Sequence, residues 1–347
     1  MKENTTVVAV DIAKAVFQLA ISESPDQPIR DRRLRRSEFL AFFEKLPQAT
    51  VAMEACGSAH HWAREIQALG HTVELIPPHL VRPYVPRTKT DRADARAILE
   101  ARRNRDIHLV PIKSVSQQVL GAMHRFRSGW IGTRTAQVNT IRGLLRELGI
   151  LIPVGVEHVV PQVRLLIEDA DSQVPDLLRP VLAAACDEVE LLDRRIKQTE
   201  RQLETTSEVT PHIATLRSIP GVGLITSTAL TAFVGDVDRF KSGRRFASYL
   251  GLTPNERSSG TKRRLGGISK RGDRYLRTLL IHGARSVICH AKRAKSHDHL
   301  RTWVLALQSR SRHNKAAVAL ANKIARIVWA TWKNGRPYES REVATAA

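Results

Sequence analysis

Four acidic residues near the start of the chain occupy positions where a carboxylate is costly unless it has a task. Asp11 and Glu54 each interrupt an apolar, strand-like run, and Asp91 and Asp94 stand three apart, so that they share one face of a helix. An isolated carboxylate among buried strands is unstable unless a cation or hydrogen bonds compensate it. Four that converge would form an all-oxygen site suited to Mg²⁺ or Mn²⁺, which can promote phosphoryl transfer.

Each acid alone also has an ordinary structural explanation. Asp11 could end a strand as a turn residue, and Asp91 could occupy the favourable first turn of a helix that begins after Thr90. The four acids together are stronger evidence for a metal site than any one of them. How strong depends on whether the strands and the helix that carry them bring them together.

A basic segment in the second half offers a different kind of chemistry. Residues 249–277 contain Pro254 and several glycines, which predict a loop, and Ser258 and Ser259 precede Gly260 among lysines and arginines. Guanidinium groups can stabilise both a serine alkoxide and a pentavalent phosphate. Taken alone, Ser-Ser-Gly in a basic loop is more typical of a turn than of a nucleophile. The residues predicted to bind nucleic acid here are Arg257, Lys262, Arg263, Arg264, Lys270 and Arg271.

The charge of the chain indicates a polyanionic partner. Its 347 residues include 55 Lys and Arg against 34 Asp and Glu, a net charge of +21, and 42% are hydrophobic, which excludes a disordered polycation. Residues 239–277 hold 12 basic and 2 acidic residues, whereas residues 165–210 hold 5 basic and 11 acidic ones. The basic block predicts a surface for phosphates, although a face that only maintains solubility is the alternative.

Other broad classes are less compatible with the sequence. No apolar run reaches the roughly 18 residues that a membrane-spanning helix needs, and Asp11 falls where a secretory signal would be apolar. The three cysteines form no CxxC pair. We therefore expect a soluble, cytoplasmic protein without membrane contact.

Residues 1–112 predict an α/β domain with a mixed sheet. Three strands come first, and the chain then alternates between helix and strand. The predicted strands are 5–13, 16–22, 29–35, 50–56 and 71–76, and the predicted helices are 38–46, 59–69 and 90–103. Acids on the first and fourth strands and on the last helix are typical of an RNase H-like nuclease domain.

Residues 113–210 predict a helical, coiled-coil region. A helix covers 115–148, and a second runs from about 180 to 203 with a 4-3 spacing of apolar or small residues. Those residues are Leu178, Leu182, Ala185, Val189, Leu192, Ile196, Thr199 and Leu203. The seam could pack against 115–148 of the same chain or against another subunit; we slightly favour the second.

Residues 211–338 predict a mainly helical domain, followed by a tail at 339–347. Within it, the pattern of 216–233 predicts a helix-hairpin-helix, in which Gly221 and Gly223 let backbone N–H groups approach a phosphate without reading bases. An ordinary tight turn between two helices is the alternative.

Six motifs in order make the chain resemble the bacterial DEDD insertion-sequence transposases, a family that includes Piv-type DNA invertases. They cover nearly the whole chain. The motifs are VDIAK at 10–14, MEACG at 53–57, KTDRADA at 89–95, SIPGVG at 218–223, LGLTP at 250–254 and SSG…SKRGDRYLR at 258–277. One departure is Cys56, where the family often has threonine.

The resemblance implies a fold and a mechanism. It implies a RuvC-like N-terminal domain whose Asp11, Glu54, Asp91 and Asp94 bind Mg²⁺ or Mn²⁺. It also implies a C-terminal domain whose serine forms a covalent link to DNA, and the glycine after it selects Ser259 over Ser258.

The expected partners are donor and target DNA, a bridge RNA and further copies of the chain in a dimer or tetramer with composite sites. Two rival functions remain open: a metal-dependent nuclease similar to a Holliday-junction resolvase, which forms no covalent intermediate, and a nucleic-acid-binding protein without catalysis.

Overall fold

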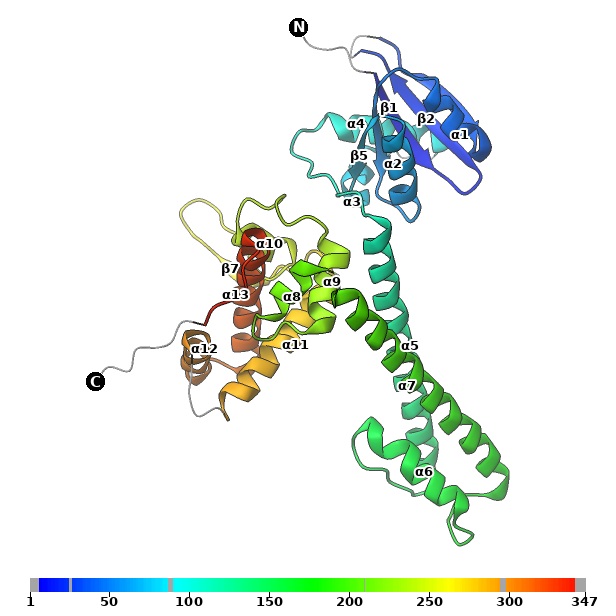
Figure 1. Ribbon diagram of the computed structural model, residues 1–347, viewed down its shortest axis with the longest axis vertical. Coiled ribbons are helices and arrows are strands. Elements are labelled where there is room, and N and C mark those ends of the chain that lie inside the picture. The colour runs from blue at the N-terminus through cyan, green and yellow to red at the C-terminus, as the bar shows by residue number, and fades with distance from the viewer. Residues whose placement is uncertain (1–5, 25–26, 87–89, 209, 294–297, 341–347) are drawn as a thin grey trace, which may run out of the picture. The chain divides into compact units, whose positions relative to one another are not determined.

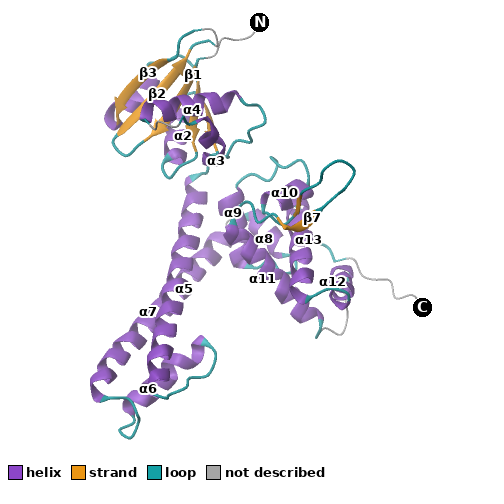
Figure 2. Cartoon of the chain, turned by 180° about the vertical axis from the view of Figure 1, so that it is seen from behind, coloured by secondary structure: helices purple, strands orange, loops and turns teal. Residues whose placement is uncertain are grey.

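The chain divides into two compact units, Met1–Val115 and Ser116–Ala347 (Figure 1). The computed structural model describes residues 6–24, 27–86, 90–208, 210–293 and 298–340. The first unit combines a sheet with helices, and the second is helical apart from one short hairpin among its described residues (Figure 2). The predicted division of the second unit near residue 210 stays a prediction.

The first unit is built on a five-stranded mixed sheet in the order β3-β2-β1-β4-β5. Strands β1, β2 and β3 pair antiparallel, whereas β4 and β5 run parallel to β1. The strands are β1 (Val7–Ile12), β2 (Val16–Ser22), β3 (Arg30–Arg35), β4 (Thr50–Glu54) and β5 (Thr72–Ile76). The mixed sheet predicted from the sequence is confirmed, and it is consistent with the RuvC-like domain that the resemblance implies.

One face of this sheet carries large side chains. Val8 and Val10 of β1 pack with Val51 and Met53 of β4 under α1 (Phe39–Glu44) and α2 (Ala59–Ala68). Aromatic rings close this core edge to face: the ring centroid of Phe17 lies 4.4 Å from that of Phe39 and 5.2 Å from that of Trp62. The short elements after β3 and β5 are η1 (Arg36–Glu38), α3 (Pro78–Val81) and η2 (Arg82–Tyr84).

The opposite face is lined by a row of alanines, and α4 (Asp91–Arg103) lies on it. Ala20, Ala9 and Ala52 are register partners on β2, β1 and β4, and each is fully buried. Small side chains let the helix approach the sheet closely. The register partners at the two edges of this row are acids, Asp31 on β3 and Glu74 on β5, and each pairs with an arginine of α4. Nη2 of Arg96 lies 2.6 Å from Oδ2 of Asp31, and Nε of Arg102 lies 2.8 Å from Oε2 of Glu74.

The second unit begins with two long antiparallel helices, α5 (Val115–Glu147) and α7 (Arg179–Glu208). Leu182, Cys186 and Val189 of α7 share a core with α5 and with α6 (Val159–Glu168). Short turns η3 (Val156–His158) and η4 (Asp176–Leu178) flank α6. This part of the apolar seam predicted on α7 is thus buried against α5 and α6 of the same chain, which is the alternative that the sequence favoured slightly less. Pairing of the seam between subunits stays a prediction.

The remaining helices enclose a second apolar core around Phe246, Leu280 and Leu320. These helices are α8 (Pro211–Arg217), α9 (Leu224–Val234), α10 (Gly243–Tyr249), α11 (Arg274–Ala291), α12 (His299–Ser309) and α13 (His313–Asn334). The hairpin of β6 (Pro254–Glu256) and β7 (Leu265–Ile268) extends from this helical core. It lies inside the segment predicted as a loop.

Candidate functional site

Asp11 and Glu54 lie at the same end and on the same face of the sheet. The parallel pairing of β1 with β4 joins Val10 to Met53, so the next residue of each strand stands at the carboxyl end of that pair. Side chains alternate between the two faces of a sheet along a strand, so Asp11 lies on the same face as Ala9, and Glu54 lies on the same face as Ala52. This is the face that α4 covers. Both acids are half-buried and interact with other residues.

Asp91 and Asp94 form the first turn of α4. Thr90 caps the helix, with its hydroxyl oxygen accepting a hydrogen bond from the N–H of Ala93 at 3.2 Å. At helical spacing both aspartates lie on the side of α4 that buries Ala95 against the sheet. Asp91 is exposed and Asp94 half-buried. All four predicted acids therefore belong to one side of the sheet.

The donor set of these acids fits a hard divalent cation, because carboxylate oxygens are the ligands that Mg²⁺ and Mn²⁺ favour. Within the described residues, however, no three His, Cys, Asp or Glu side chains come together in a group that could hold a metal ion. The structure thus places the four acids on a common face without closing a ligand cage around them.

Ser259 begins the tight turn at the tip of the β6–β7 hairpin. Its backbone N–H donates to the carbonyl of Lys262 at 3.3 Å, and the N–H of Lys262 donates back at 3.2 Å. Gly260 follows with φ +55°, a conformation that glycine adopts most easily. All residues from 254 to 267 are exposed, including the predicted nucleic-acid-binding residues Arg257, Lys262, Arg263 and Arg264.

The two neighbouring serines have different surroundings. The Ser258 hydroxyl donates to Oε1 of Glu256 at 2.8 Å and accepts from the N–H of Arg264 at 3.2 Å. Hydrogen bonds from Ser258 and Arg263 hold the pKa of Glu256 below its ordinary value. Ser258 is therefore part of the hairpin's own hydrogen bonding, whereas the Ser259 hydroxyl has no hydrogen-bond partner in the described parts of the chain.

Two glycines and one buried arginine anchor the base of the hairpin. A Cβ on Gly251 would lie 2.0 Å from the carbonyl oxygen of Arg271, and a Cβ on Gly272 would lie 1.9 Å from that of Tyr249. The segments on either side of the hairpin thus touch backbone to backbone. Arg277, only 9% exposed, donates to the carbonyls of Leu250 at 3.2 Å and Arg271 at 3.3 Å. Sequence reasoning did not single out Arg277 because its partners are backbone atoms.

Gly221 and Gly223 lie between α8 and α9, so two helices do flank the SIPGVG turn. Gly221 has φ +84°, and a Cβ there would lie 2.8 Å from the carbonyl oxygen of Gly283 on α11. The positive φ and the close packing against α11 therefore explain why glycine occupies position 221, without any contact to a phosphate. Gly223 is exposed at the start of α9. Assignment as a helix-hairpin-helix, and phosphate contact at either glycine, stay predictions.

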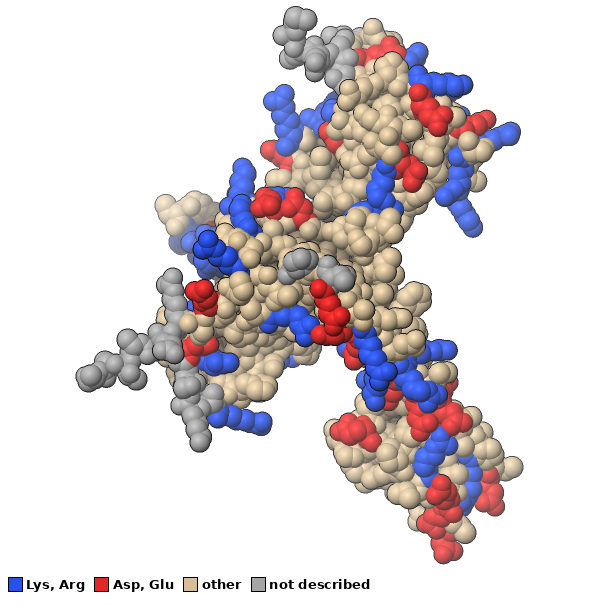
Figure 3. All heavy atoms as spheres, in the orientation of Figure 1, with Lys and Arg blue, Asp and Glu red and all other residues tan. Residues whose placement is uncertain are grey.

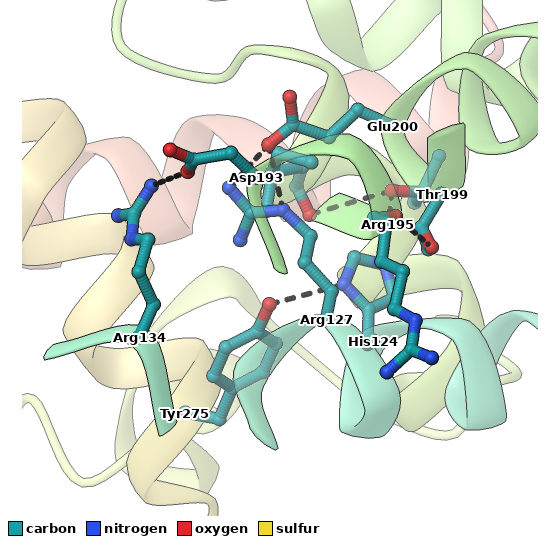
Figure 4. A network of polar contacts seen from close by, with 10 residues as sticks. His124, Arg127, Arg134, Asp193, Arg195, Thr199, Glu200 and Tyr275 are labelled. Atoms are coloured by element: carbon teal, nitrogen blue, oxygen red, sulfur yellow. Dashed lines mark hydrogen bonds and ion pairs between the residues drawn. The ribbon is translucent and has the colours of Figure 1, made fainter. Parts of the chain in front are cut away.

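A buried polar network joins α5 to α9 and α11 (Figure 4). His124 is 1% exposed, and its ring nitrogens lie 3.0 Å from the hydroxyls of Tyr275 and Thr228. Burial, followed by the charge of Arg127, lowers the pKa of His124 to about 4. The histidine is therefore neutral near pH 7.

Ion pairs between α5 and α7 flank this network. Arg127 donates to Glu200 at 2.8 Å, and Arg134 donates to Asp193 at 2.5 Å (Figure 4). Because sequence alone does not show which histidine is buried against which helix, His124 was not predicted. The ion pairs hold α7 on α5, and the hydrogen bonds of His124 join α5 to the helical core that carries the hairpin.

Lysine and arginine side chains gather around the hairpin on the visible face of the second unit (Figure 3). The far ends of α5 and α7 instead present both signs of charge in the same view. The basic block therefore lies over one part of the surface, as expected for a contact with phosphates. No helix among the described residues is long and apolar enough to cross a membrane.

Comparisons with known proteins match both units. Residues 8–150 match a DEDD transposase family, and residues 213–301 match the family described as Transposase IS116/IS110/IS902. The chain is 42% identical to a probable family 20 transposase of Pseudomonas aeruginosa over 94% of this chain and 96% of the relative.

Two further relatives are transposases of named insertion sequences. The transposase for insertion sequence element IS1111A of Coxiella burnetii is 38% identical over 93% of this chain and 88% of its own length. The transposase for IS1328 of Yersinia enterocolitica is 34% identical over 96% and 98%.

Proposed function

Because this chain belongs to the IS116/IS110/IS902 transposase family and is thus a DNA-recombining enzyme, we propose that it cuts and rejoins the ends of its insertion sequence through a covalent link to Ser259. The observation that carries this proposal is the contrast between the two serines. The Ser258 hydroxyl is engaged by Glu256 and Arg264, which leaves the exposed Ser259 hydroxyl as the candidate nucleophile.

The bond changes follow from the chemistry of a serine nucleophile. Oγ of Ser259 loses its proton and attacks a backbone phosphorus, one P–O bond of the DNA breaks, and the leaving DNA hydroxyl takes up a proton. The phosphodiester energy is kept in the phosphoserine, so a second DNA hydroxyl can displace the serine without ATP. Arg257, Lys262, Arg263 and Arg264 would stabilise the charge on the phosphate, and Lys270 and Arg271 would hold the backbone nearby.

Membership of a DEDD transposase family indicates dependence on a divalent metal. Asp11, Glu54, Asp91 and Asp94 are the residues that would hold it, as Mg²⁺ or Mn²⁺, on the α4 side of the sheet. When bound, such an ion supplies positive charge for phosphate oxygens and lowers the pKa of a coordinated hydroxyl. The four carboxylates would orient the ion and compensate its charge.

The proposed partners follow from the same chemistry. The exposed basic hairpin and the turn at Gly221 and Gly223 would contact DNA or RNA backbone, and specificity would come from base pairing with a bridge RNA. We also propose that the enzyme works at the nucleoid as a dimer or tetramer. Because α5 and α6 cover Leu182, Cys186 and Val189 of α7, contacts between copies would use other surfaces than this part of the helix.

Covalent trapping tests the nucleophile. The full chain is incubated with Mg²⁺, labelled duplex carrying the ends of its own element, and RNA transcribed from the same element. Labelled DNA that stays on the protein after denaturation is then measured for wild type, Ser259→Ala, Ser258→Ala and Asp11→Ala. We expect an adduct in wild type and Ser258→Ala and none in the other two. Cleavage without adduct that survives Ser259→Ala would instead establish a resolvase-like nuclease.

A further inference from the structure

A groove of about 1520 Å³ lies in the second unit between α13 and the base of the β6–β7 hairpin. Residues of α13 line it along one side of the helix, including Lys315, Asn322 and Arg326. Trp303 of α12 and Gly267 of β7 also line it. Apart from Lys270, none of its residues belongs to the nucleic-acid-binding set predicted from the sequence.

The charges of this groove favour an anionic occupant. Five cationic residues line it and, among the described residues, no acidic one does. The five are Arg244, Lys270, Lys315, Lys323 and Arg326. Burial is the main cause that lowers the pKa of Lys323, and the charge of Arg326 lowers it further. An anion between Lys323 and Arg326 would offset their mutual repulsion.

The walls of the groove suit flat, apolar groups. The half-buried Trp303, Trp329 and Ile327 contribute apolar surface. The Lys323 ammonium lies 4.1 Å from the centroid of the Trp303 ring, which favours one orientation of that ring. Asn255 and Asn314 add amide groups that can donate and accept hydrogen bonds. This combination of cations, an aromatic ring and amides is what nucleotides require.

Two glycines of β7 expose backbone without side chains along the groove. Gly266 and Gly267 are consecutive, and neither has the positive φ that would explain glycine. A Cβ on Gly267 would meet no atom within 4 Å, so packing inside the chain does not require glycine there. Glycine in a strand often marks a place where a ligand or another backbone approaches closely.

Lys270, which lines the groove, is held in an unusual conformation. It is the one non-glycine residue with positive φ, +54°, in the described residues. Its N–H donates to the carbonyl of Gly251 at 3.1 Å, which holds the strained backbone in place. Such strain is concentrated at functional sites, and here it orients a lysine at the groove.

We propose that this groove binds an unpaired nucleic-acid strand, with phosphates on the cationic rim and bases against Trp303 and the β7 glycines. A duplex hides its bases and would use only the cations, so the apolar walls favour a single strand. The inference rests on the proposed function, because DNA recombination exposes unpaired strands. It adds to that function a binding site away from the Ser259 turn.

Fluorescence anisotropy of the full chain tests the proposal. The probes are 5′-fluorescein dT12 and rU12, measured in EDTA so that metal-dependent cleavage cannot contribute. The first variant, Lys315→Ala with Arg326→Ala, removes two exposed charges from the groove. Its matched control, Arg125→Ala with Arg146→Ala, removes two exposed charges from α5, outside the groove.

A charge-neutral pair completes the design. Gly267→Leu fills open space in the groove, whereas Gly129→Leu fills open space on α5. We expect the groove variants to weaken binding about tenfold and the controls less than twofold. Losing two phosphate contacts should also reduce the slope of log Kd against log salt by about 1.4. Whether dT12 or rU12 binds more tightly identifies the strand as DNA or RNA.

Three results would overturn the proposal: equal losses in groove and control variants, full binding by Gly267→Leu, or tighter groove-dependent binding of a labelled polyglutamate peptide than of either oligonucleotide. The last result would assign the groove to an acidic peptide. Ser259→Ala should bind both probes as wild type does. Loss of the covalent adduct and loss of groove binding are therefore separate outcomes, so the failure of one idea is distinguishable from failure of the other.

Discussion

Asp11 and Glu54 follow fully buried residues on two paired strands, whereas Ser259 stands at the tip of a hairpin whose residues from 254 to 267 are all exposed. The position of the acids is set by the packing of α4 on the alanine row. The position of the serine is set at a distance, by backbone contacts at Gly251 and Gly272. In the same enzyme, core packing thus positions the candidate metal-binding groups, whereas contacts at the base of the β6–β7 hairpin position the candidate nucleophile.

The largest effect that tests this comparison is on activity. Glu54→Gln removes one charge from the proposed metal site, and we expect strand cleavage to fall about 1000-fold, equivalent to roughly 4 kcal/mol of transition-state stabilisation. Glu74→Gln is the control, because Glu74 lies on the neighbouring strand and pairs with Arg102. Its cleavage rate should stay within about threefold of wild type. Equal losses in the two variants would remove Glu54 from the site.

The next effect separates the base of the hairpin from its tip. Gly272→Ala forces a Cβ to within 1.9 Å of a carbonyl oxygen, so the second unit should lose more than about 3 kcal/mol of stability. Gly260→Ala also has positive φ but meets nothing within 4 Å, and should cost only about 1 kcal/mol. Urea denaturation followed by circular dichroism measures both. Similar costs would mean that the base does not anchor the hairpin.

Acid should act on the second unit through His124. The folded-state pKa of about 4 lies below the ordinary 6.5, so the unfolded chain binds the extra proton. The stabilisation is present above pH 6.5 and is lost as the pH falls from 6.5 towards 4, by up to roughly 3 kcal/mol. Denaturation of wild type and His124→Gln at pH 7.5 and 4.5 gives the difference. A wild type that is no more acid-sensitive than the variant would contradict the prediction.

The smallest effects concern ion pairs. Arg96 binds Asp31, whose side chain is only 12% exposed. Burial raises the pKa of Asp31, but Arg96 and Arg92 together hold it below its ordinary value. We expect Arg96→Ala to cost about 1 kcal/mol. Arg263→Ala breaks the exposed pair with Glu256 and should cost less than about 0.5 kcal/mol. Thermal unfolding of both variants checks the order, and a reversed order would show that the hairpin pair contributes more than its exposure suggests.

Much of the first unit could be predicted because its signals are local. The predicted strand at 16–22 coincides with β2, and Gly70 and the proline pair at 77–78 mark the ends of α2 and β5. The predicted helix start after Thr90 is confirmed by the Thr90 cap of α4. The sequence could not show how closely the four acids approach one another, because that depends on the packing of α4 across the sheet.

The second unit was less predictable where long-range contacts decide the structure. The 4-3 repeat predicted the buried side of α7 but not its partner, because a repeat of this kind fits any complementary helix. α6 was missed because Pro161 interrupts its pattern, although the first turn of a helix tolerates proline. The hairpin was predicted as a loop because its short strands are exposed and its anchors, Gly251 and Gly272, lie 21 positions apart.

The alanine row in the first unit limits which substitutions the chain can accept. Valine at Ala9 or Ala52 would add two methyl groups beneath α4, and a close-packed interior absorbs such volume by moving the helix. The helix carries Asp91 and Asp94, so an apolar change that leaves the unit folded would still displace half of the acids. With the four acids as the proposed metal ligands, such a change would therefore lower catalytic activity, although neither alanine side chain can take part in catalysis.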